Sequence, residues 1–509
     1  MEKDNPILIV GAGPTGLAMA LTLWKTGVSF RIIEKRSGPG EASRALVVQA
    51  RILEHYQQLG FADKLVEAGI PLTSVHLREG NEEKAAFKLS NMGKSLSPFP
   101  YVLSLPQDVH EQLLVKELEK SGVQIEWNTE LVSFTDEGNE VHAILEQNGE
   151  EEHIKAAYLC GCDGAHSTVR HRMKVEFPGG TYDQLFFVAD VEANSEELIM
   201  GDFYMYMDGE GFLIFMPVRR KGIMRIIGIV PEQFSQQEEV GFWDIYPSVK
   251  EKIHVDVTNV NWFSKYRVHH RVSEHFKKGR VFIAGDAGHI HSPAGGQGMN
   301  TGIGDAINLA WKLASVVKGK AAVTLLDTYE TERIGFAKTL VSTTDKAFTN
   351  IIGNHLRGRL IRTIVFPYVI PFLLGFSFAQ KGAFKTLSQT RIHYQDSDIS
   401  EGEAGNVKAG ERLPWVELDS GDNFKPLQSF DWQVHVYGVV EKRMRDFLQS
   451  KHIDLHVFPW SKEMEKAGFK EHAVYLLRPD GYVAFAAEEQ DVHKLDEYFT
   501  RFTIRSLFS

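Results

Sequence analysis

The first chemically informative residues form a glycine turn near the start of the chain. The turn consists of Gly11, Gly13, Pro14, Thr15 and Gly16. It follows an apolar run at residues 6–10, which is typical of a buried strand, and it precedes a helix-favouring stretch. Gly11 permits a tight turn, Gly13 lets a pyrophosphate approach the backbone, and Gly16 lets the helix lie close to the sheet. The free N–H groups at the start of such a helix attract phosphate.

An acid stands where the second strand of this unit ends. Residues 28–33 are strand-like, and Glu34 follows them, with Lys35 beside it. A carboxylate at this position can accept hydrogen bonds from the two ribose hydroxyls, and it disfavours a 2′-phosphate. The unit therefore predicts a site for FAD or NAD rather than NADP.

Two further strand ends carry an acid and glycines. Asp163-Gly164 follows the apolar strand 157–162, and Gly285-Asp286 follows the apolar strand 280–284. A glycine-rich loop at residues 292–300 then opens a long helix, which is a second anion-binding arrangement. Because parallel strands end at one edge of their sheet, all three segments are expected to face one ligand. His289 and His291 lie close by, but two histidines without further ligands do not predict a metal site.

Composition narrows the class of protein. With 509 residues the chain is expected to form two or three domains, and its net charge of −11 argues against nucleic-acid partners. Its only two cysteines, Cys160 and Cys162, exclude a disulfide framework, and the polar start shows no signal peptide, so we expect a cytoplasmic protein. The most apolar later stretch, residues 364–378, is too short for a membrane span and contains two prolines, so we expect a buried or pocket-lining helix.

The pattern of elements predicts an α/β protein. We expect a Rossmann-type domain for FAD or NAD at 1–182 and 266–400, with a helical region in its second part. An antiparallel substrate-binding sheet is expected at 183–265, joined by a segment from 75–100. A polar, glycine-rich stretch around 402–410 reads as a linker to a small α/β domain at 405–509.

Taken together, the three motifs resemble the single-component, class A FAD-dependent aromatic hydroxylases, and the likeness covers essentially the whole chain. The last hundred residues, with Arg478-Pro479-Asp480-Gly481, resemble the thioredoxin-like domain of the phenol hydroxylase and polyketide hydroxylase branch. The resemblance implies the para-hydroxybenzoate hydroxylase-like fold. It also implies oxygen insertion from O2 into an aromatic substrate through a flavin C4a-hydroperoxide. FAD would be the resident cofactor, NADPH or NADH a transient reductant, and a homodimer an open possibility.

The resemblance also implies roles for individual residues. The cofactor-binding set is Gly11, Gly13, Pro14, Thr15, Gly16, Glu34, Lys35, Arg44, Gln107, Asp163, Gly164, Gly285, Asp286, Pro293, Gly296, Gly298, Met299 and Asn300. Pro293 would lie over the isoalloxazine ring, and the amides of Gly298 to Asn300 would face the N1–C2 edge of the flavin. Pro293 and Arg44 are the candidates for a direct part in catalysis. The candidate substrate contacts are Phe203, Phe212, Phe215 and Pro217.

The sequence departs from the family pattern in three places. Arg333 is followed by Ile334 rather than proline, Phe485 stands where relatives often carry tryptophan, and the last hundred residues lack Cys-x-x-Cys. The last departure leaves a thiol redox role of that domain unsupported.

Three alternatives share parts of the pattern. A flavin halogenase typically has a Trp-x-Trp element, and none of the eight tryptophans here forms such a pair. The second alternative is an FAD-dependent reductase of isoprenoid lipids. The third is a non-catalytic flavoprotein that sequesters an aromatic ligand. Hydroxylated product distinguishes the enzyme we favour from the reductase, and rapid NAD(P)H oxidation distinguishes it from the binding protein.

Overall fold

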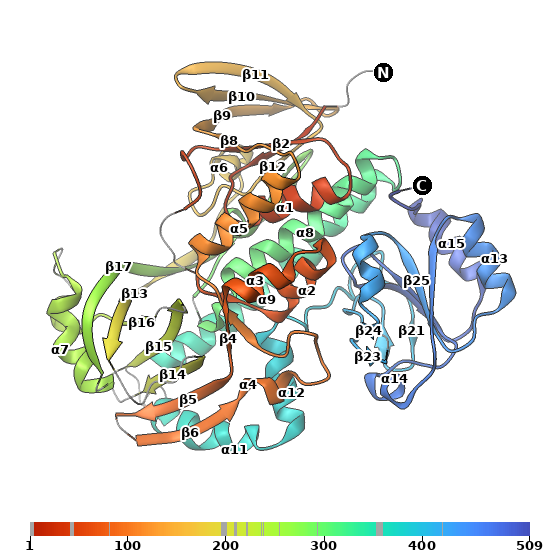
Figure 1. Cartoon of the computed structure of the whole chain (residues 1–509). Coiled ribbons are helices and arrows are strands. Elements are labelled where there is room, and N and C mark those ends of the chain that lie inside the picture. Colours follow the sequence, from red (N-terminus) through yellow and green to blue (C-terminus); the bar gives the residue numbers. More distant parts are fainter. Residues whose placement is uncertain are drawn as a thin grey trace.

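The structure is a computed structural model that describes residues 5–40, 45–80, 82–194, 201–207, 211–219, 222–235, 237, 239–253, 255–292, 294–352, 360–419 and 421–508. Figure 1 shows a central α/β unit, a large sheet on one side of it and a second α/β unit at the C-terminal end. Arg44 and Pro293, both predicted to act in catalysis, lie outside the described residues.

A six-stranded sheet forms the centre of the first unit. Its order is β18-β19-β12-β1-β2-β8, and the four middle strands run parallel. Their bounds are β1 Ile7–Val10, β2 Phe30–Glu34, β12 Tyr158–Gly161, β19 Val281–Ile283, with β8 Glu126–Trp127 and β18 Lys277–Lys278 at the edges. The predicted apolar runs are therefore neighbouring strands that end at one edge. Three helices cover this sheet, namely α1 Pro14–Lys25, α5 Gln107–Lys120 and α8 Gly298–Val317.

Smaller elements surround this sheet. An antiparallel hairpin sheet holds β9 Thr129–Asp136, β10 Val141–Gln147 and β11 Glu150–Ala156. The turn between β10 and β11 holds Asn148 and Gly149, both at positive φ. A second small sheet holds β3 Val47–Val48, β7 Val102–Ser104 and β4 Ile70–Leu72, and the nearby helices are α2 Ala50–Leu59, α3 Ala62–Ala68 and α6 Thr168–Met173.

The large sheet has eight strands in the order β20-β17-β13-β16-β15-β14-β5-β6. Their bounds are β20 His289–Ile290, β17 Asp256–Val272, β13 Gly179–Asn194, β16 Ile223–Ile229, β15 Phe212–Arg219, β14 Asp202–Met207, β5 Ser74–Glu79 and β6 Glu82–Lys88. Helix α7 (Phe242–Ile253) packs on one face, and Phe348 of α9 (Asp327–Ile352) packs on the other. Strand β20 lies between the Gly285-Asp286 motif and the glycine-rich loop, so this sheet is joined directly to the predicted flavin loops.

The apolar stretch at 364–378, expected to be a buried or pocket-lining helix, is not buried. It folds into a π-helical segment η5 (Ile361–Val369) and two short helices, α11 (Ile370–Leu374) and α12 (Ser377–Leu387). Phe372 is 69% exposed and Phe378 is 73% exposed. The prediction was wrong because hydrophobicity alone does not show whether other elements cover a segment. Within the described residues, no helix combines the length and the apolar character that crossing a membrane requires.

The stretch at 402–410 is also not a flexible linker. It forms a hairpin of β21 (Glu403–Ala404) and β22 (Val407–Lys408), in which Ala404 and Val407 are buried. Glycine is needed at position 402 because the backbone there packs closely on β28 (Val483–Ala487): a Cβ on Gly402 would lie 2.2 Å from the Ala486 carbonyl oxygen. The polar, glycine-rich composition of this stretch therefore reflects a tightly packed hairpin rather than a linker.

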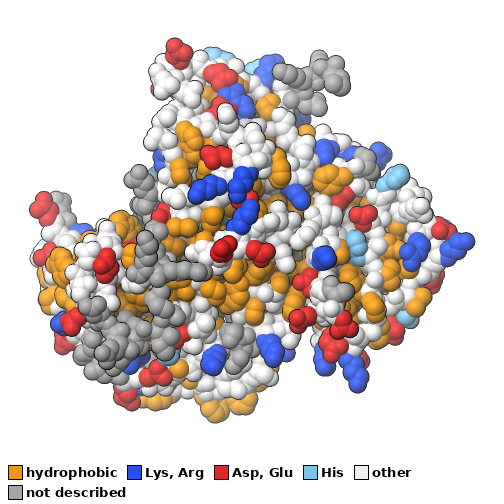
Figure 2. Space-filling view, in the orientation of Figure 1, with side chains coloured by type: hydrophobic (Ala, Val, Ile, Leu, Met, Phe, Trp, Pro, Cys, Tyr) orange, Lys and Arg blue, Asp and Glu red, His pale blue; other side chains and the backbone are white. Residues whose placement is uncertain are grey.

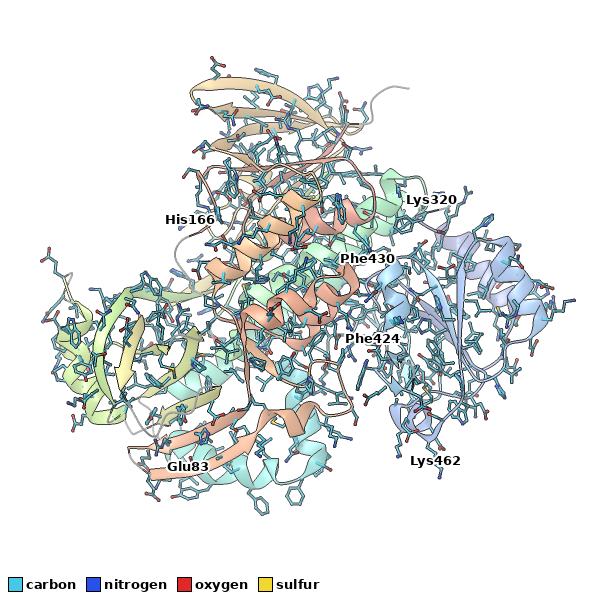
Figure 3. The ribbon with its side chains drawn as sticks, in the orientation of Figure 1. Glu83, His166, Lys320, Phe424, Phe430 and Lys462 are labelled. Atoms are coloured by element: carbon cyan, nitrogen blue, oxygen red, sulfur yellow. The ribbon has the colours of Figure 1, made fainter. Side chains whose placement is uncertain are left out.

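The C-terminal unit is a four-stranded sheet with helices around it. The order is β26-β25-β27-β28, with bounds β26 Asp454–Phe458, β25 Gln433–Tyr437, β27 Val474–Leu477 and β28 Val483–Ala487. Its helices are α13 Lys442–Ser450, α14 Lys462–Ala467 and α15 Val492–Phe502. Phe424 and Phe430, labelled in Figure 3, flank the short helix η6 (Lys425–Ser429) on the side next to α2. Buried Trp432 stands edge-on to Trp311 of α8, so the two units share one hydrophobic core.

Candidate active site

The predicted glycines converge at the carboxyl edge of the six-stranded sheet. A Cβ on Gly16 would lie 1.9 Å from the Gly11 carbonyl oxygen, and one on Gly11 would lie 2.5 Å from the Cys162 carbonyl oxygen. Both positions therefore exclude any side chain. Thr15 Oγ1 would lie 2.6 Å from a Cβ on Gly285 and equally close to one on Gly302, so the first turn packs directly on the third motif.

Gly13 differs from its neighbours because open space surrounds it. A Cβ at this position would have no other residue's atom within 4 Å. Gly13 is the N-cap of α1, no side chain caps that helix, and its first turn carries no acid. Pro14 occupies the first turn, where its missing N–H costs nothing. The geometry is a cradle of backbone donors with room for a pyrophosphate.

Glu34 is buried and ionised at the end of β2. Its Oε2 accepts from the Ala12 amide at 2.9 Å, and its Oε1 accepts from Arg36 Nε at 3.0 Å. Burial acts to raise the pKa of Glu34, but the hydrogen bonds from Arg36 and Ala12 hold it below its ordinary value. Sequence reasoning missed Arg36, although its position two residues after the acid was a usable signal. Lys35 between them is exposed.

Gln107, at the start of α5, supports the loop after β2. Its Oε1 accepts from the Ala45 amide at 3.2 Å, and its Nε2 donates to Glu111 Oε1 at 2.8 Å. The other oxygen of Glu111 accepts from the Gly40 amide at 2.8 Å. The two side chains thus anchor both ends of the loop that contains Arg44.

Asp163 presents an unsatisfied oxygen beside the first turn. Its Oδ2 accepts from the Val169 amide at 3.1 Å, while its buried Oδ1 has no hydrogen-bond partner in the described structure. Burial raises the pKa of this carboxyl. Gly164 follows at a φ of +77° with open space around it. An orphaned buried acceptor normally has a partner, so this edge fits a ligand that donates to it.

The Gly285-Asp286 turn is held from behind by a buried ion pair. The Gly285 amide and His289 Nε2 both contact Asp305 Oδ2, at 3.0 and 2.7 Å. Arg333 Nε donates to the other oxygen of Asp305 at 2.6 Å. Asp286 itself is exposed on the turn. The late-helix Arg333 therefore positions the turn, and it does so without the proline that relatives often carry after it.

The N-terminus of α8 faces the same region. No side chain caps it and no acid lies in its first turn, which leaves Gly298 and Met299 at a positive helix end. The Asn300 side chain has a structural part, since Oδ1 accepts from the Gln49 amide and Nδ2 donates to the Val47 carbonyl, both at 2.8 Å. Gly296 completes the loop at a φ of +62°.

His291 is a polar group in this loop that we considered only as a metal ligand. Its Nδ1 lies 2.7 Å from the Ser292 carbonyl oxygen, and its buried Nε2 has no partner in the described structure. A Cβ on Gly298 would lie 3.7 Å from that Nε2. Burial lowers the pKa of His291 to about 4, so the ring is neutral at pH 7. The described residues contain no cluster of three metal-ligating side chains.

The four substrate candidates lie on different faces of the large sheet. Phe212 belongs to an aromatic cluster with Phe186 and Phe348, whereas Phe215 packs on the other face against α7. Phe203 is half-buried against the central core, and the Pro217 carbonyl accepts from Ser104 Oγ at 2.6 Å. Side chains alternate along a strand, so Phe212 and Phe215 cannot line one pocket.

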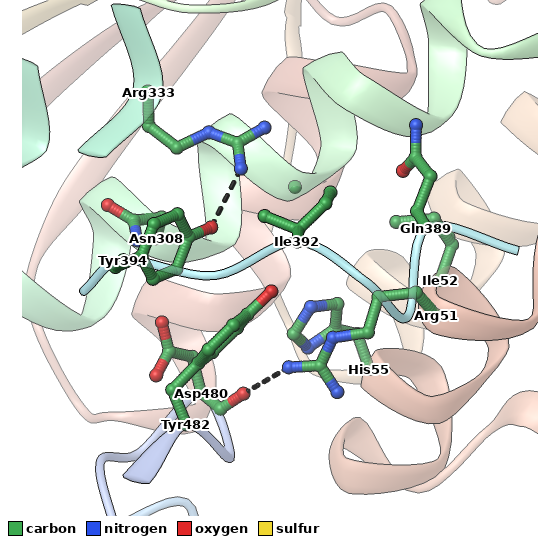
Figure 4. A pocket seen from close by; sticks show the side chains of 11 residues that line it. Arg51, Ile52, His55, Asn308, Arg333, Gln389, Ile392, Tyr394, Asp480 and Tyr482 are labelled. Atoms are coloured by element: carbon green, nitrogen blue, oxygen red, sulfur yellow. Dashed lines mark hydrogen bonds between the residues drawn. The ribbon is translucent and has the colours of Figure 1, made fainter. Parts of the chain in front are cut away.

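A buried polar cluster behind the site joins the two units (Figure 4). Arg333 donates to the Tyr394 hydroxyl at 2.7 Å, and Arg51 donates to the Asp480 carbonyl at 2.6 Å. They border a cavity of about 10 Å³, which holds about one water. Next to it, Arg478 pairs with Glu332 of α9 at 2.9 Å. The C-terminal unit is thus connected through α9 to the Gly285-Asp286 turn.

Comparison with known proteins agrees with this geometry. Residues 4–344 match the protein family described as FAD binding domain. The chain is 35% identical to 6-methylpretetramide 4-monooxygenase of Streptomyces rimosus, over 82% of this chain and 76% of that protein. It is 29% identical to pentachlorophenol 4-monooxygenase of Sphingobium chlorophenolicum, over 82% and 77%.

Solved structures extend the likeness to the fold of the whole chain. The flavin-dependent monooxygenase PieE, solved with FAD and substrate, superposes with a TM-score of 0.80 at 22% identity and covers 99% of both chains. The cradle at Gly13, the orphaned Asp163 oxygen and the buried Glu34 fit FAD, which confirms the cofactor expected from the sequence. The chain belongs to the FAD-binding domain family and, within it, to the FAD-dependent aromatic monooxygenases.

Proposed function

We propose that this enzyme uses NAD(P)H and O2 to hydroxylate an aromatic substrate, phenolic or polyketide-like. The observation that carries the proposal is the junction of β17 with β20. It connects the aromatic sheet directly to the loop between Gly285 and the N-terminus of α8. Relatives named for a chlorinated phenol and for 6-methylpretetramide support an aromatic substrate.

The protein's part in this reaction is to bind, to orient and to exclude water. FAD supplies the redox chemistry when it is bound. Glu34 would hold the ribose, the N-terminus of α1 would hold the pyrophosphate, and the N-terminus of α8 would stabilise negative charge on the reduced ring. Aromatic side chains around Phe212 and Phe348 would give the substrate an apolar surface that keeps water away.

The reductant and the compartment are proposed on sequence evidence. The sequence has no second glycine fingerprint, so we propose that the nicotinamide cofactor binds transiently at the flavin site rather than in a domain of its own. Cys160 and Cys162 are both buried and unpaired, which supports a reducing, cytoplasmic location.

A substrate screen followed by isotope labelling tests the function. Phenols, aromatic acids and polyketide antibiotics are screened for faster NADPH and NADH oxidation, and the best substrate is then turned over under labelled oxygen gas. The expected product carries one labelled oxygen atom. Product oxygen that comes from water, or stimulated oxidation that gives no oxygenated product from any substrate, would refute the proposal. The same experiment separates hydroxylation from reduction of an isoprenoid lipid.

A further inference from the structure

Exposed hydrophobic side chains gather on one surface, formed by residues 360–378. Among the described residues, eight of the fifteen large hydrophobic side chains that are exposed lie within this short segment. Three of them are phenylalanines in contact, with ring centroids of Phe372 and Phe376 5.6 Å apart and those of Phe376 and Phe378 5.8 Å apart. Figure 2 shows hydrophobic side chains along the lower edge of the molecule, where Figure 1 places α11. Contiguous exposed apolar surface of this kind marks an interaction site.

The same part of the chain has an unusual charge. Residues 346–395 contain no aspartate or glutamate, although the whole protein has a net charge of −11. The basic residues of this stretch are Lys346, Arg357, Arg359, Arg362, Lys381, Lys385 and Arg391. Lys381 and Lys385 are exposed on α12, directly after the apolar segment. Apolar and basic groups therefore occur together on an otherwise acidic protein.

The two strands next to this surface hold equal numbers of acids and bases, namely Glu79, Glu82 and Glu83 against Arg78, Lys84 and Lys88. They are β5 and β6, which contact η5 and α11. Glu79 and Glu82 both pair with Lys84, at 3.5 and 2.5 Å, and Glu83 contacts His76 at 2.7 Å. The neighbouring strands therefore do not cancel the basic character of the 346–395 stretch.

We propose that the surface at residues 360–378 docks the enzyme on the surface of an anionic lipid bilayer. Aromatic and aliphatic side chains enter the headgroup region of a bilayer, and lysines beside them meet lipid phosphates. A second copy of the chain suits this surface less well, because a twofold contact would set the basic stretch against itself. The segment lies on the membrane and does not cross it, in agreement with the three short helices that form it.

Vesicle co-sedimentation of the FAD-loaded full-length enzyme tests the proposal. One set of vesicles contains equal parts of phosphatidylglycerol and phosphatidylcholine, and the other contains phosphatidylcholine alone. The enzyme is expected to sediment with the anionic vesicles and to dissociate as salt is raised. Phe372→Ser combined with Phe378→Ser should weaken binding roughly tenfold or more. Lys381→Gln and Lys385→Gln should each weaken it roughly fivefold.

Matched controls replace the same kinds of residue elsewhere. The control for the phenylalanines is Trp243→Ser, because Trp243 is 53% exposed on α7. The control for the lysines is Lys462→Gln, because Lys462 is exposed on the C-terminal unit (Figure 3). Both should bind vesicles like the unmodified enzyme. Flavin absorbance verifies that each variant is folded. Failure to sediment with either vesicle, or equal binding by the surface variants, overturns the proposal. Sedimentation velocity that shows a dimer broken by the phenylalanine variants, without vesicle binding, assigns the surface to a second copy instead.

Discussion

At the scale of single residues, the glycines of the first turn have different physical roles. Gly11 and Gly16 are required by the protein itself, because a Cβ at either would clash with a carbonyl oxygen. At Gly13 an added Cβ would meet no other residue, so the fold does not require glycine there, and we propose that a bound cofactor does. The structure thus separates the two glycines that the fold requires from one at which a side chain would fit.

Gly13→Val is therefore expected to abolish FAD binding while the protein stays folded. The branched side chain would fill the space of the pyrophosphate, and the loss of charge-assisted hydrogen bonds of about 1.5–3 kcal/mol each should weaken binding roughly a hundredfold or more. Titration of the apoprotein with FAD, followed by flavin fluorescence, measures the effect. Gly335→Val is the control, since Gly335 also has open space around it but lies on the exposed face of α9, away from the first glycine turn. Equal FAD affinity in the two variants would contradict the assignment.

Glu332 gives the molecule a predictable response to acid. Burial acts to raise its pKa, but Arg478 and Lys312 lower it to about 2 in the folded protein, below the ordinary value of 4.5. The stabilisation is therefore complete above pH 4.5 and is lost as pH falls through 2. The shift corresponds to roughly 3 kcal/mol.

Urea unfolding at several pH values measures this contribution. Between pH 5 and 7 the stability difference between the unmodified protein and Glu332→Gln should be constant. It should shrink as pH falls below 4.5. Glu489→Gln, on the exposed surface, is the control and should show no such trend. A difference that is independent of pH down to 3 would show that Glu332 does not carry the effect.

At the scale of elements, the packing of α8 against α9 holds the Gly285-Asp286 turn in place. Asp305 of α8 receives Arg333 of α9 on one oxygen and the Gly285 amide on the other. These groups are almost fully buried, so their arrangement is fixed. The helix pair is therefore expected to control how firmly the Gly285-Asp286 turn is held.

Arg333→Met is expected to destabilise the protein by about 3–5 kcal/mol, because it leaves Asp305 as an unpaired buried charge. FAD affinity should fall as well, although Arg333 lies behind the turn. Thermal unfolding and FAD titration measure the two effects, and adding Asp305→Asn should restore part of both. Lys451→Met breaks an exposed pair with Asp496 and should change stability by less than about 1 kcal/mol. A normal FAD affinity in Arg333→Met would refute the positioning role.

The elements also show what the sequence could and could not predict. Buried parallel strands are continuous apolar runs, so β1, β2, β12 and β19 were predictable, and the glycine and acid motifs followed from their ends. Exposure of α11 was not predictable, because it depends on which distant elements cover it. The hairpin at 403–408 was missed because its glycines make close contacts that only the partner strand reveals. His291 was missed because its burial depends on the fold of the loop.

At the scale of the whole molecule, the C-terminal unit is part of the core rather than an appendage. Arg412 pairs with Glu54 of α2 at 2.6 Å, and Trp311 of α8 donates to Asp480 at 3.0 Å. The residues in these pairs are separated by 358 and 169 positions in the chain. Sequence patterns reveal local elements, but they carry no signal for contacts this distant.

Removal of residues 405–509 is therefore expected to give an insoluble or unfolded protein. Glu54, Glu332 and Trp311 would lose their partners in the C-terminal unit and become exposed to water. Calorimetry of the full chain should show one transition rather than two, because the units share a core. Expression of residues 405–509 as a separate chain beside the truncated one should restore some soluble, yellow protein. A truncated protein that alone stays soluble and binds FAD would contradict this prediction.

The pairing of Glu332 with Arg478 also has a consequence for synthesis on the ribosome. Arg478 follows Glu332 by 146 positions, so at about 5–20 residues per second it is made roughly 7–30 s later. Among the described residues, Glu332 pairs with Lys312 and Arg478, and during that interval the nascent chain contains Lys312 but not Arg478. Helices α8 and α9 can pack, but the face that meets the C-terminal unit stays open to water. The finished flavin site thus depends on residues translated last, and chaperones have a long period in which to engage the growing chain.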